Sequence, residues 1–326
     1  MREGYRNRCP HGWRRFLFRR EYYPGNNYYG VGEILRRYAG LPPWFPLNCK
    51  IQHGVKFFRA YASPAECPNH LAFYSSPEPR CLFLMFNEPD AAFFREHGVG
   101  NVRAIGSAAV YLDGYLDRLR AEHPDPRGTI AFPCKSSTST DVVMDLEAYA
   151  DMLVALPERF QPVRVSLYYK DLEKGRDKPF RERGLEVRCC GTLHSQDYLW
   201  NFFANIADCR YAVSNDLCSS ANYYSMYYGL RYFSYGPRVE GFEANNPGDR
   251  QYGRERMDGR AVTGHEFPME ACEDTARQRA IAEQVLGADR RLSPAALRGL
   301  LLGRLSPGFL ARWTAALYFK RFRRAY

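Results

Sequence analysis

The chain has 326 residues, 45% of them hydrophobic and 15% aromatic, which is enough for two α/β domains of ordinary size with buried cores. Its ten cysteines are scattered, without the regular spacing of a disulfide framework, and the sequence shows no secretory signal. We therefore expect a protein of the reducing cytoplasm rather than a secreted protein stabilised by disulfides. No apolar run approaches the ~20 residues that span a bilayer.

The formal net charge of +10 is concentrated at the two ends of the chain. Residues 1–37 contain nine arginines against three glutamates, and residues 291–326 contain eight basic residues and no acidic ones. A nucleic-acid-binding domain more often carries its basic residues across its core surface, so nucleic acid is not the expected partner. Basic ends rich in Leu, Phe, Trp and Tyr predict peripheral attachment at the inner membrane face. A tail helix packed on the body with a solvated basic face would have the same composition.

The first part of the chain alternates between strand-like and helical patterns. The expected strands are 47–52, 70–74, 81–87 and 102–105. The expected helices are 32–38, 91–97 and 111–122. This alternation is typical of a parallel sheet with crossover helices. The Pro-rich segment 123–128 then predicts a linker, which ends an N-terminal α/β domain at residue 122.

The pattern restarts after the linker and predicts a second α/β domain over residues 129–270. Strands are expected at 129–132, 163–169, 185–190 and 210–213. Helices are expected at 145–156, 179–183, 195–208 and 221–228, the last closed by Gly229. The segment 241–264 is polar and rich in Gly and Asn, which predicts a loop. Residues 271–326 are expected to form basic C-terminal helices.

The turn between strand 210–213 and helix 221–228 has the composition of an anion site. Residues 214–220 are small and polar, and the first turn of the helix presents unpaired N–H groups at the positive end of its dipole. Ser219 and Ser220 add hydroxyl donors, so a phosphate can be held there without a metal. An ordinary helix N-cap in an α/β domain is the alternative.

Other chemistry-bearing residues follow strands of the first domain. Ligands of open parallel sheets bind at the carboxyl ends of the strands, so we expect a site in a cleft between the domains. His53, which precedes a glycine, is the leading candidate for a general base. Glu88 and Asp90 are the rival bases. A loop histidine and a solvated turn are the corresponding alternatives.

The second half also resembles the donor-binding domain of GT-B glycosyltransferases that build bacterial capsules and lipopolysaccharides. The resemblance rests on GTIAFP (128–133), VSLYYKD (165–171), GLEV (184–187), Gly191, DCRYAVSN (208–215), Ser219-Ser220 and Tyr235-Gly236. Residues 48–54, which end in His-Gly, show a weaker resemblance to the first domain of that family. Many relatives place a histidine after the Phe-Pro strand end, whereas this chain has Cys134 and Lys135.

The resemblance implies two Rossmann-like domains that face a cleft and a nucleotide-sugar donor. The serine pair is similar to the phosphate-binding serines of bacterial sialyl- and Kdo-type transferases, which implies a CMP-activated sugar. Lys135 and its neighbouring serines are expected to contact phosphate. The residues assigned to donor binding are Lys135, Ser136, Ser137, Asp171, Gly191, Ser214, Asn215, Ser219 and Ser220.

The sequence therefore predicts a metal-independent, peripheral cytoplasmic glycosyltransferase that acts on a surface-glycan or lipid-linked acceptor. No Asp-x-Asp string and no clustered zinc ligands are present, so no metal ligand is assigned. No cofactor is expected, since the nucleotide-sugar is a donor substrate. Two alternatives remain open: a glycerophosphate or polyol-phosphate transferase of the teichoic-acid type, and a non-catalytic protein that binds anionic polymers.

Overall fold

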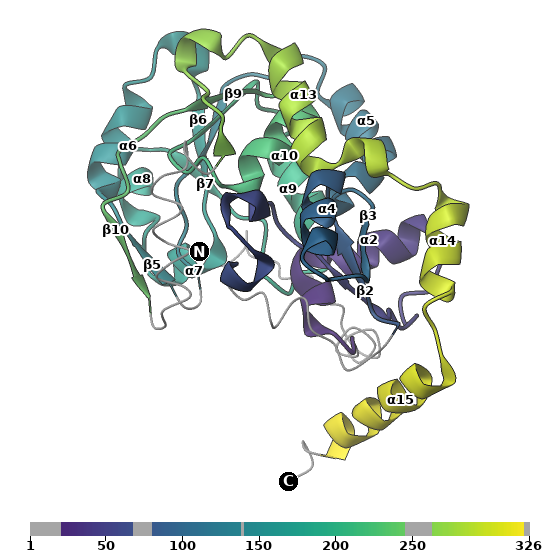
Figure 1. Cartoon of the computed structure of the whole chain (residues 1–326). Coiled ribbons are helices and arrows are strands. Elements are labelled where there is room, and N and C mark those ends of the chain that lie inside the picture. Colours follow the sequence, from purple (N-terminus) through teal and green to yellow (C-terminus); the bar gives the residue numbers. More distant parts are fainter. Residues whose placement is uncertain (1–20, 68–79, 138–139, 245–262, 323–326) are drawn as a thin grey trace.

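The computed structural model describes residues 21–67, 80–137, 140–244 and 263–322 (Figure 1). Within these ranges the chain is a mixed α/β protein with two parallel sheets and an antiparallel ribbon. The arginine-rich residues 1–20 and the strand expected at 70–74 lie outside the described residues. The predicted domain boundaries and the linker at 123–128 stay predictions.

The first sheet is formed by three parallel strands in the order β1-β2-β3. Their bounds are Cys49–Ile51, Leu82–Met85 and Val102–Ala104. The helix α2 (Val31–Tyr38) precedes β1 in the chain, α4 (Glu88–Glu96) connects β2 to β3, and α5 (Asp113–Glu122) follows β3. Every residue of β2 is buried, as expected of the central strand of a parallel sheet covered on both faces. The alternation predicted for this part of the chain is confirmed.

The second sheet has five parallel strands in the order β7-β6-β4-β8-β9. Their bounds are Glu186–Arg188, Val163–Ser166, Thr129–Phe132, Tyr211–Ser214 and Arg231–Ser234. In chain order this is 3-2-1-4-5, the order of a Rossmann sheet, with the reversal of direction between β4 and β8. Ligands of such sheets bind beyond the carboxyl ends of the strands at this reversal. The predicted Rossmann-like second half is confirmed as a fold.

Helices connect the strands of the second sheet close to the expected positions. They are α6 (Leu146–Val154), α7 (Tyr169–Glu173), α8 (Lys178–Glu182), α9 (Tyr198–Ile206) and α10 (Ser220–Tyr228). The strand expected at 163–169 ends early, at Ser166, because the chain turns into α7. The tyrosines of α10 are buried and pack in the core.

The prediction of a loop throughout 241–264 is wrong for its first four residues. The strand β10 (Gly241–Ala244) pairs antiparallel with β5 (Thr140–Val143), which the sequence also failed to indicate. The pair is stabilised by a small apolar cluster in which Val142 packs with Cys134 and Val239. Residues 245–262 lie outside the described residues.

The two sheets share one buried apolar cluster. Leu84 of the first sheet and Ala212 of the second belong to the same group of packed side chains, and the tyrosines of α10 join them. The helix α13 (Thr275–Leu286) packs against α10, and the Gln278 amide donates to the carbonyl oxygen of Tyr232 at 2.8 Å. The Asn87 amide then donates to the Val285 carbonyl at 3.1 Å, so α13 connects the second sheet to the first.

The last two helices are α14 (Pro294–Leu302) and α15 (Pro307–Phe322). Leucines of α14 are buried in the shared cluster, whereas most of α15 extends away from the body at the lower right of Figure 1. Near its start, Phe309 is buried, with its ring centroid 5.5 Å from that of Tyr22. Among the described residues, no helix combines the length and apolar character that a membrane span requires.

Candidate functional site

The polar turn after β8 forms the start of α10, as the sequence predicts. The helix begins at Ser220 and ends at Tyr228, followed by Gly229 with a left-handed φ of 115°. The Ser219 hydroxyl oxygen caps the helix by accepting from the Ala221 amide at 3.4 Å. The N-terminus of α10 therefore lies beyond the carboxyl end of β8, beside the reversal in strand order.

The loop that carries His53 contacts this helix start directly. The Val55 amide donates to the Ser220 hydroxyl oxygen at 2.9 Å. A Cβ atom added to Gly54 would lie 3.3 Å from the same oxygen, so the two backbones approach closely. Because the hydroxyl accepts from Val55, its own hydrogen can still be donated to a ligand. The structure thus brings the loop that carries His53 against Ser220, although the sequence places the two in different halves.

Aromatic rings and Lys135 complete this junction of the two sheets. The His53 ring lies 5.1 Å from the Tyr28 ring, edge to face, and 6.0 Å from the Tyr29 ring. The Lys135 ammonium lies 5.6 Å from the centre of the Tyr29 ring and 4.9 Å from that of Tyr168. We call His53, Lys135, Ser220, Tyr29 and Tyr168 the junction site.

Sequence reasoning did not find the tyrosines of the junction site. Tyr29 is the one non-glycine residue of the described ranges with a positive φ, 56°. Backbone strain of this kind is concentrated at functional sites. The neighbouring Gly-Asn-Asn-Tyr-Tyr-Gly string is the signal that could have indicated a tight turn there.

The electrostatics of the junction keep the imidazole neutral. Burial lowers the pKa of His53 to about 3, and the positive charges of Lys56 and Lys135 act in the same direction. The neutral ring is the form that accepts a proton, although at this pKa it is a weak base. An anion bound beside Lys135 would offset that charge and raise the pKa of His53.

Two of the predicted donor-binding residues hold the loops around the junction. The Asn215 carbonyl oxygen accepts from the Cys134 amide at 2.8 Å, and its NH₂ group donates to the Pro237 carbonyl at 2.9 Å. The buried Ser214 hydroxyl donates to the Phe132 carbonyl at 2.8 Å. These contacts join the ends of β4, β8 and β9. A donor contact for Ser214 or Asn215 stays a prediction.

Asp171 is buried and fixes the loop after β4. Its carboxylate accepts from the Ser136 amide at 3.2 Å and pairs with Arg176 at 3.1 Å. The Ser136 hydroxyl oxygen faces the ribbon and accepts from the Val142 amide at 3.3 Å, and the Ser137 amide donates to Thr140 at 2.7 Å.

Gly191, with a φ of 106°, lies at the end of β7 against Ser195, which would clash with any added Cβ. Gly191 lies near the carboxyl edge of the second sheet, as its place in the sequence predicts. Its contact with the donor stays a prediction.

The two rival bases occupy different surroundings. Glu88 opens α4 at the surface and pairs with Arg95 and, at 4.0 Å, with Arg290. Asp90 is only 6% exposed, and its Oδ2 accepts from the Asn87 amide at 3.0 Å. Burial raises the pKa of Asp90 to about 7, against the opposing effects of the hydrogen bond from Asn87 and the charge of Arg59.

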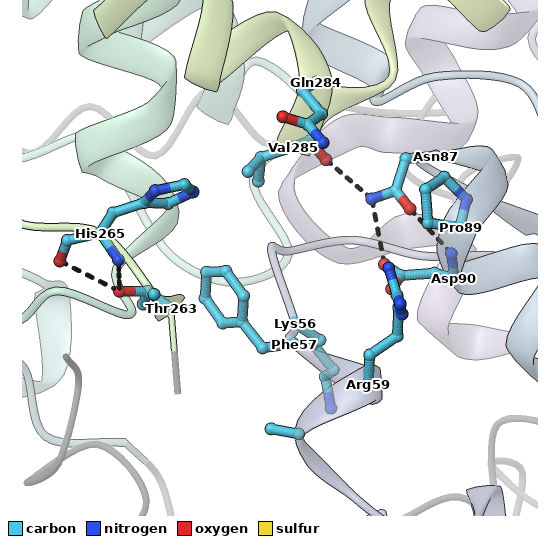
Figure 2. A pocket seen from close by; sticks show the side chains of 12 residues that line it. Lys56, Phe57, Arg59, Asn87, Pro89, Asp90, Thr263, His265, Gln284 and Val285 are labelled. Atoms are coloured by element: carbon cyan, nitrogen blue, oxygen red, sulfur yellow. Dashed lines mark hydrogen bonds between the residues drawn. The ribbon is translucent and has the colours of Figure 1, made fainter. Parts of the chain in front are cut away.

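Asp90 lines a cavity of about 370 Å³ between α4, the segment 56–60, residues 263–265 and the end of α13 (Figure 2). Lys56, Arg59 and His265 contribute the other ionisable side chains. Lys56 is also one of the charges that lower the pKa of His53. The cavity and the junction site are therefore neighbours along the loop that follows β1.

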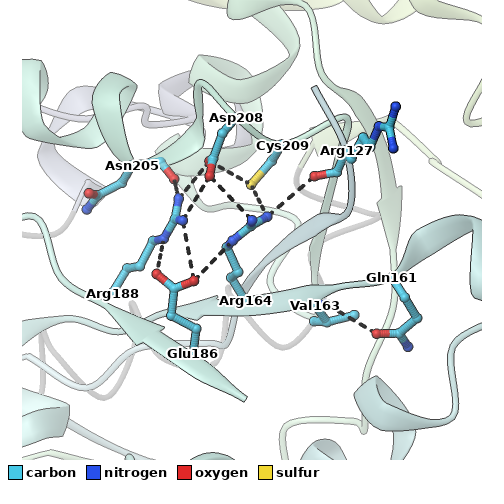
Figure 3. Close-up of polar contacts among 9 residues, drawn as sticks. All are labelled: Arg127, Gln161, Val163, Arg164, Glu186, Arg188, Asn205, Asp208 and Cys209. Atoms are coloured by element: carbon cyan, nitrogen blue, oxygen red, sulfur yellow. Dashed lines mark hydrogen bonds and ion pairs between the residues drawn. The ribbon is translucent and has the colours of Figure 1, made fainter. Parts of the chain in front are cut away.

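A second charged cluster lies at the opposite, amino-terminal edge of the second sheet (Figure 3). The Arg188 guanidinium donates to both carboxylate oxygens of Asp208, at 2.8 and 3.0 Å, and Arg164 pairs with Glu186 at 3.1 Å. Burial alone would raise the pKa of Asp208, but the two arginines outweigh it and lower that pKa. Two cations and two anions thus satisfy one another, which is the pattern of a structural network.

Among the described residues, no group of three or more His, Cys, Asp or Glu is arranged to hold a metal ion. No family model matches the chain, and no curated protein matches its sequence. Solved structures similar to it include an S. aureus MnaA structure with UDP and the UDP-GlcNAc 2-epimerase from Neisseria meningitidis bound to UDP-GlcNAc. Their identities to this chain are 9% and 8%; each alignment covers 83% of this chain and 78% of the other, with a TM-score of 0.37.

Proposed function

We propose that the chain is a metal-independent glycosyltransferase that uses a nucleotide-sugar donor, with a CMP-activated sugar as the first candidate. The observation that carries the proposal is the junction site at the strand-order reversal of a Rossmann sheet. There the start of α10, with Ser220, lies against the His53 loop of the first sheet, and Lys135 is part of the same group. The acceptor is a surface glycan or a lipid-linked sugar.

In this proposal the donor phosphates lie at the N-terminus of α10 and beside Lys135. The helix dipole, the Ser220 hydroxyl and the ammonium group stabilise the negative charge that grows on the leaving nucleotide. His53 accepts the proton of the acceptor hydroxyl as its oxygen bonds to the anomeric carbon and the sugar–phosphate bond breaks. The bound phosphates raise the pKa of His53 toward the range in which it is an effective base.

Titration with nucleotides tests the proposal against its two alternatives. Binding of CMP, UDP or GDP supports a sugar transferase. Preferential binding of CDP-glycerol would instead identify a polyol-phosphate transferase of the teichoic-acid type. If CMP, UDP, GDP and CDP-glycerol all fail to bind, and polyanions bind with an affinity that falls steeply as salt increases, the chain is a non-catalytic polymer-binding protein.

Lys135→Ala is expected to weaken nucleotide binding by about ten- to a hundred-fold, because a hydrogen bond to a charged group contributes ~1.5–3 kcal/mol. Lys178→Ala is the matched control, since Lys178 lies on α8 with its side chain 76% exposed. Isothermal titration calorimetry measures both. Ser220→Ala should act in the same direction and also loosen the contact with Val55. Equal affinities for the wild type and both Lys135→Ala and Ser220→Ala would remove the phosphate assignment.

Turnover is expected to be unchanged by EDTA, because the helix terminus and Lys135 supply the positive potential that a divalent ion would otherwise provide. The measurement is the rate of nucleotide release from the donor before and after chelation. Activity that disappears in EDTA and returns with Mn²⁺ or Mg²⁺ would contradict metal independence.

Helix α15 is proposed to attach the protein to an anionic membrane. Leu310 is exposed on this helix, and Arg312, Lys320 and Arg321 belong to the same segment; each cation near such a surface adds up to ~1 kcal/mol. A chain that ends at Ser306 is expected to lose most of its flotation with phosphatidylserine vesicles at low salt. Nucleotide binding by the shortened chain is the control for folding. Undiminished flotation would overturn the role of α15.

A further inference from the structure

The cavity beside α4 is a built polar site that the glycosyl-transfer chemistry at the junction does not use. Its volume of about 370 Å³ falls within the range of about 300–1,000 Å³ that is typical of small-molecule sites. Its wall comes from three separate parts of the chain: the segment after β1, the start of α4, and residues 263–265 with the end of α13 (Figure 2).

The start of α4 supplies a buried hydrogen-bonding group to this cavity. The Asn87 amide is fully engaged, because it donates to Asp90 Oδ2 at 3.0 Å and to the Val285 carbonyl at 3.1 Å. Within the described ranges, Asp90 Oδ1 accepts no hydrogen bond. A buried carboxyl with one unused oxygen is well suited to a ligand hydroxyl.

The segment after β1 supplies positive charge. Lys56 and Arg59 both line the cavity. Arg59 lies close enough to Asp90 for its positive charge to oppose the rise in the pKa of Asp90 that burial causes. Two cations stand against one carboxyl, so the lining favours an anion over a neutral molecule of the same size. Phe57, which lies between Lys56 and Arg59 in the sequence, also lines the cavity. Its apolar ring is suited to packing against the face of a sugar ring.

We propose that this cavity binds an acidic sugar, one that carries a carboxylate or a phosphate, as the terminal residue of the acceptor. This assignment rests on the proposed glycosyl transfer. Lys56 and Arg59 hold the anionic group, and Asp90 accepts from a ring hydroxyl. Lys56 follows His53 by three residues and its charge acts on the imidazole, so the assignment places the terminal sugar of the acceptor next to the loop that carries the base.

The test measures binding of glucuronate, glucose 6-phosphate and neutral glucose to the full chain by titration calorimetry. At least one acidic sugar is expected to bind ten-fold or more tightly than glucose, and the one that does identifies the anion. Arg59→Ala should abolish that advantage, because it removes one of the two cations proposed to hold the anion. Arg59 is exposed, so the substitution is expected to leave the fold intact. Arg118→Ala, on the surface of α5, is the matched control and should bind as the wild type.

A second variant separates the carboxyl from the cations. Asp90→Asn keeps the side-chain volume and should weaken binding of the acidic sugar several-fold without weakening the binding of inorganic phosphate. Equal affinity for glucose and both acidic sugars, or an advantage that survives Arg59→Ala, would overturn the assignment. Acidic-sugar binding that depends on Arg59 in a protein that binds no nucleotide would support the cavity and overturn the proposed glycosyl transfer instead.

Discussion

Replacing His53 by alanine is expected to reduce kcat by about 10²–10⁴-fold, the usual contribution of a general base. Nucleotide affinity should change little, since Lys135 and the start of α10 hold the phosphates in the proposed mechanism. Steady-state release of nucleotide gives kcat, and titration calorimetry gives the affinity. His194→Ala is the control, because His194 contacts the same Tyr28 ring, at 5.5 Å, but is exposed. Near-normal turnover of His53→Ala would return the role of base to Glu88 or Asp90.

The pH dependence of the wild type gives a second readout of His53. The base must be neutral, so activity falls as pH drops through its pKa. In the free enzyme burial and two lysines lower that pKa to about 3, so kcat/KM should show no loss near pH 6.5, where an ordinary histidine titrates. Bound phosphates raise the pKa in the complex, so the acid limb of kcat should lie at higher pH than that of kcat/KM.

Much of the fold could be predicted because its strongest signals are local. The strands β2, β4 and β8 are short runs of buried residues, and α10 has a serine before it and a left-handed glycine after it. The ribbon of β5 and β10 could not be predicted. Thr140–Val143 is half polar, Gly241–Ala244 begins with a glycine, and their pairing depends on a contact about a hundred residues away in sequence.

The candidate site was predictable only in part for the same reason. The sequence places His53, Lys135 and Ser220 after strands, and the parallel topology then brings their loops together. Which polar residues are engaged in holding those loops depends on distant partners. The Asn215 side chain contacts Pro237, and Asp171 accepts from the Ser136 amide; neither pairing leaves a local pattern.

Asp90 illustrates the remaining gap between the sequence and the site. Its sequence context, Glu-Pro-Asp at the start of a helix, is equally that of an ordinary solvated first turn, and its neighbour Glu88 is such a residue. Asp90 shares its cavity with residues 263–265 and the end of α13, nearly two hundred residues later in the chain, and no local pattern indicates that arrangement.

The contact of α13 with the first sheet depends on Gly287. This residue has a φ of 65°, and an added Cβ would lie 2.6 Å from the carbonyl carbon of Phe86. The neighbouring Leu286 carbonyl accepts from the Ser107 amide at 2.7 Å, so the end of α13 is fixed against the loops after β2 and β3.

Gly287→Ala is therefore expected to lower the free energy of unfolding by about 3 kcal/mol or more, since a left-handed residue with a side chain costs about 1–2 kcal/mol and the clash with Phe86 adds to it. Gly98→Ala is the matched control: its φ is 84°, with open space around the added Cβ, and only the backbone cost of about 1–2 kcal/mol applies. Urea unfolding measures both variants. Because Gly287 adjoins Val285 and faces Asn87, the variant should also lose acidic-sugar binding under conditions where it is still folded. Equal losses of stability for the two variants would show that α13 is free to shift away from the first sheet.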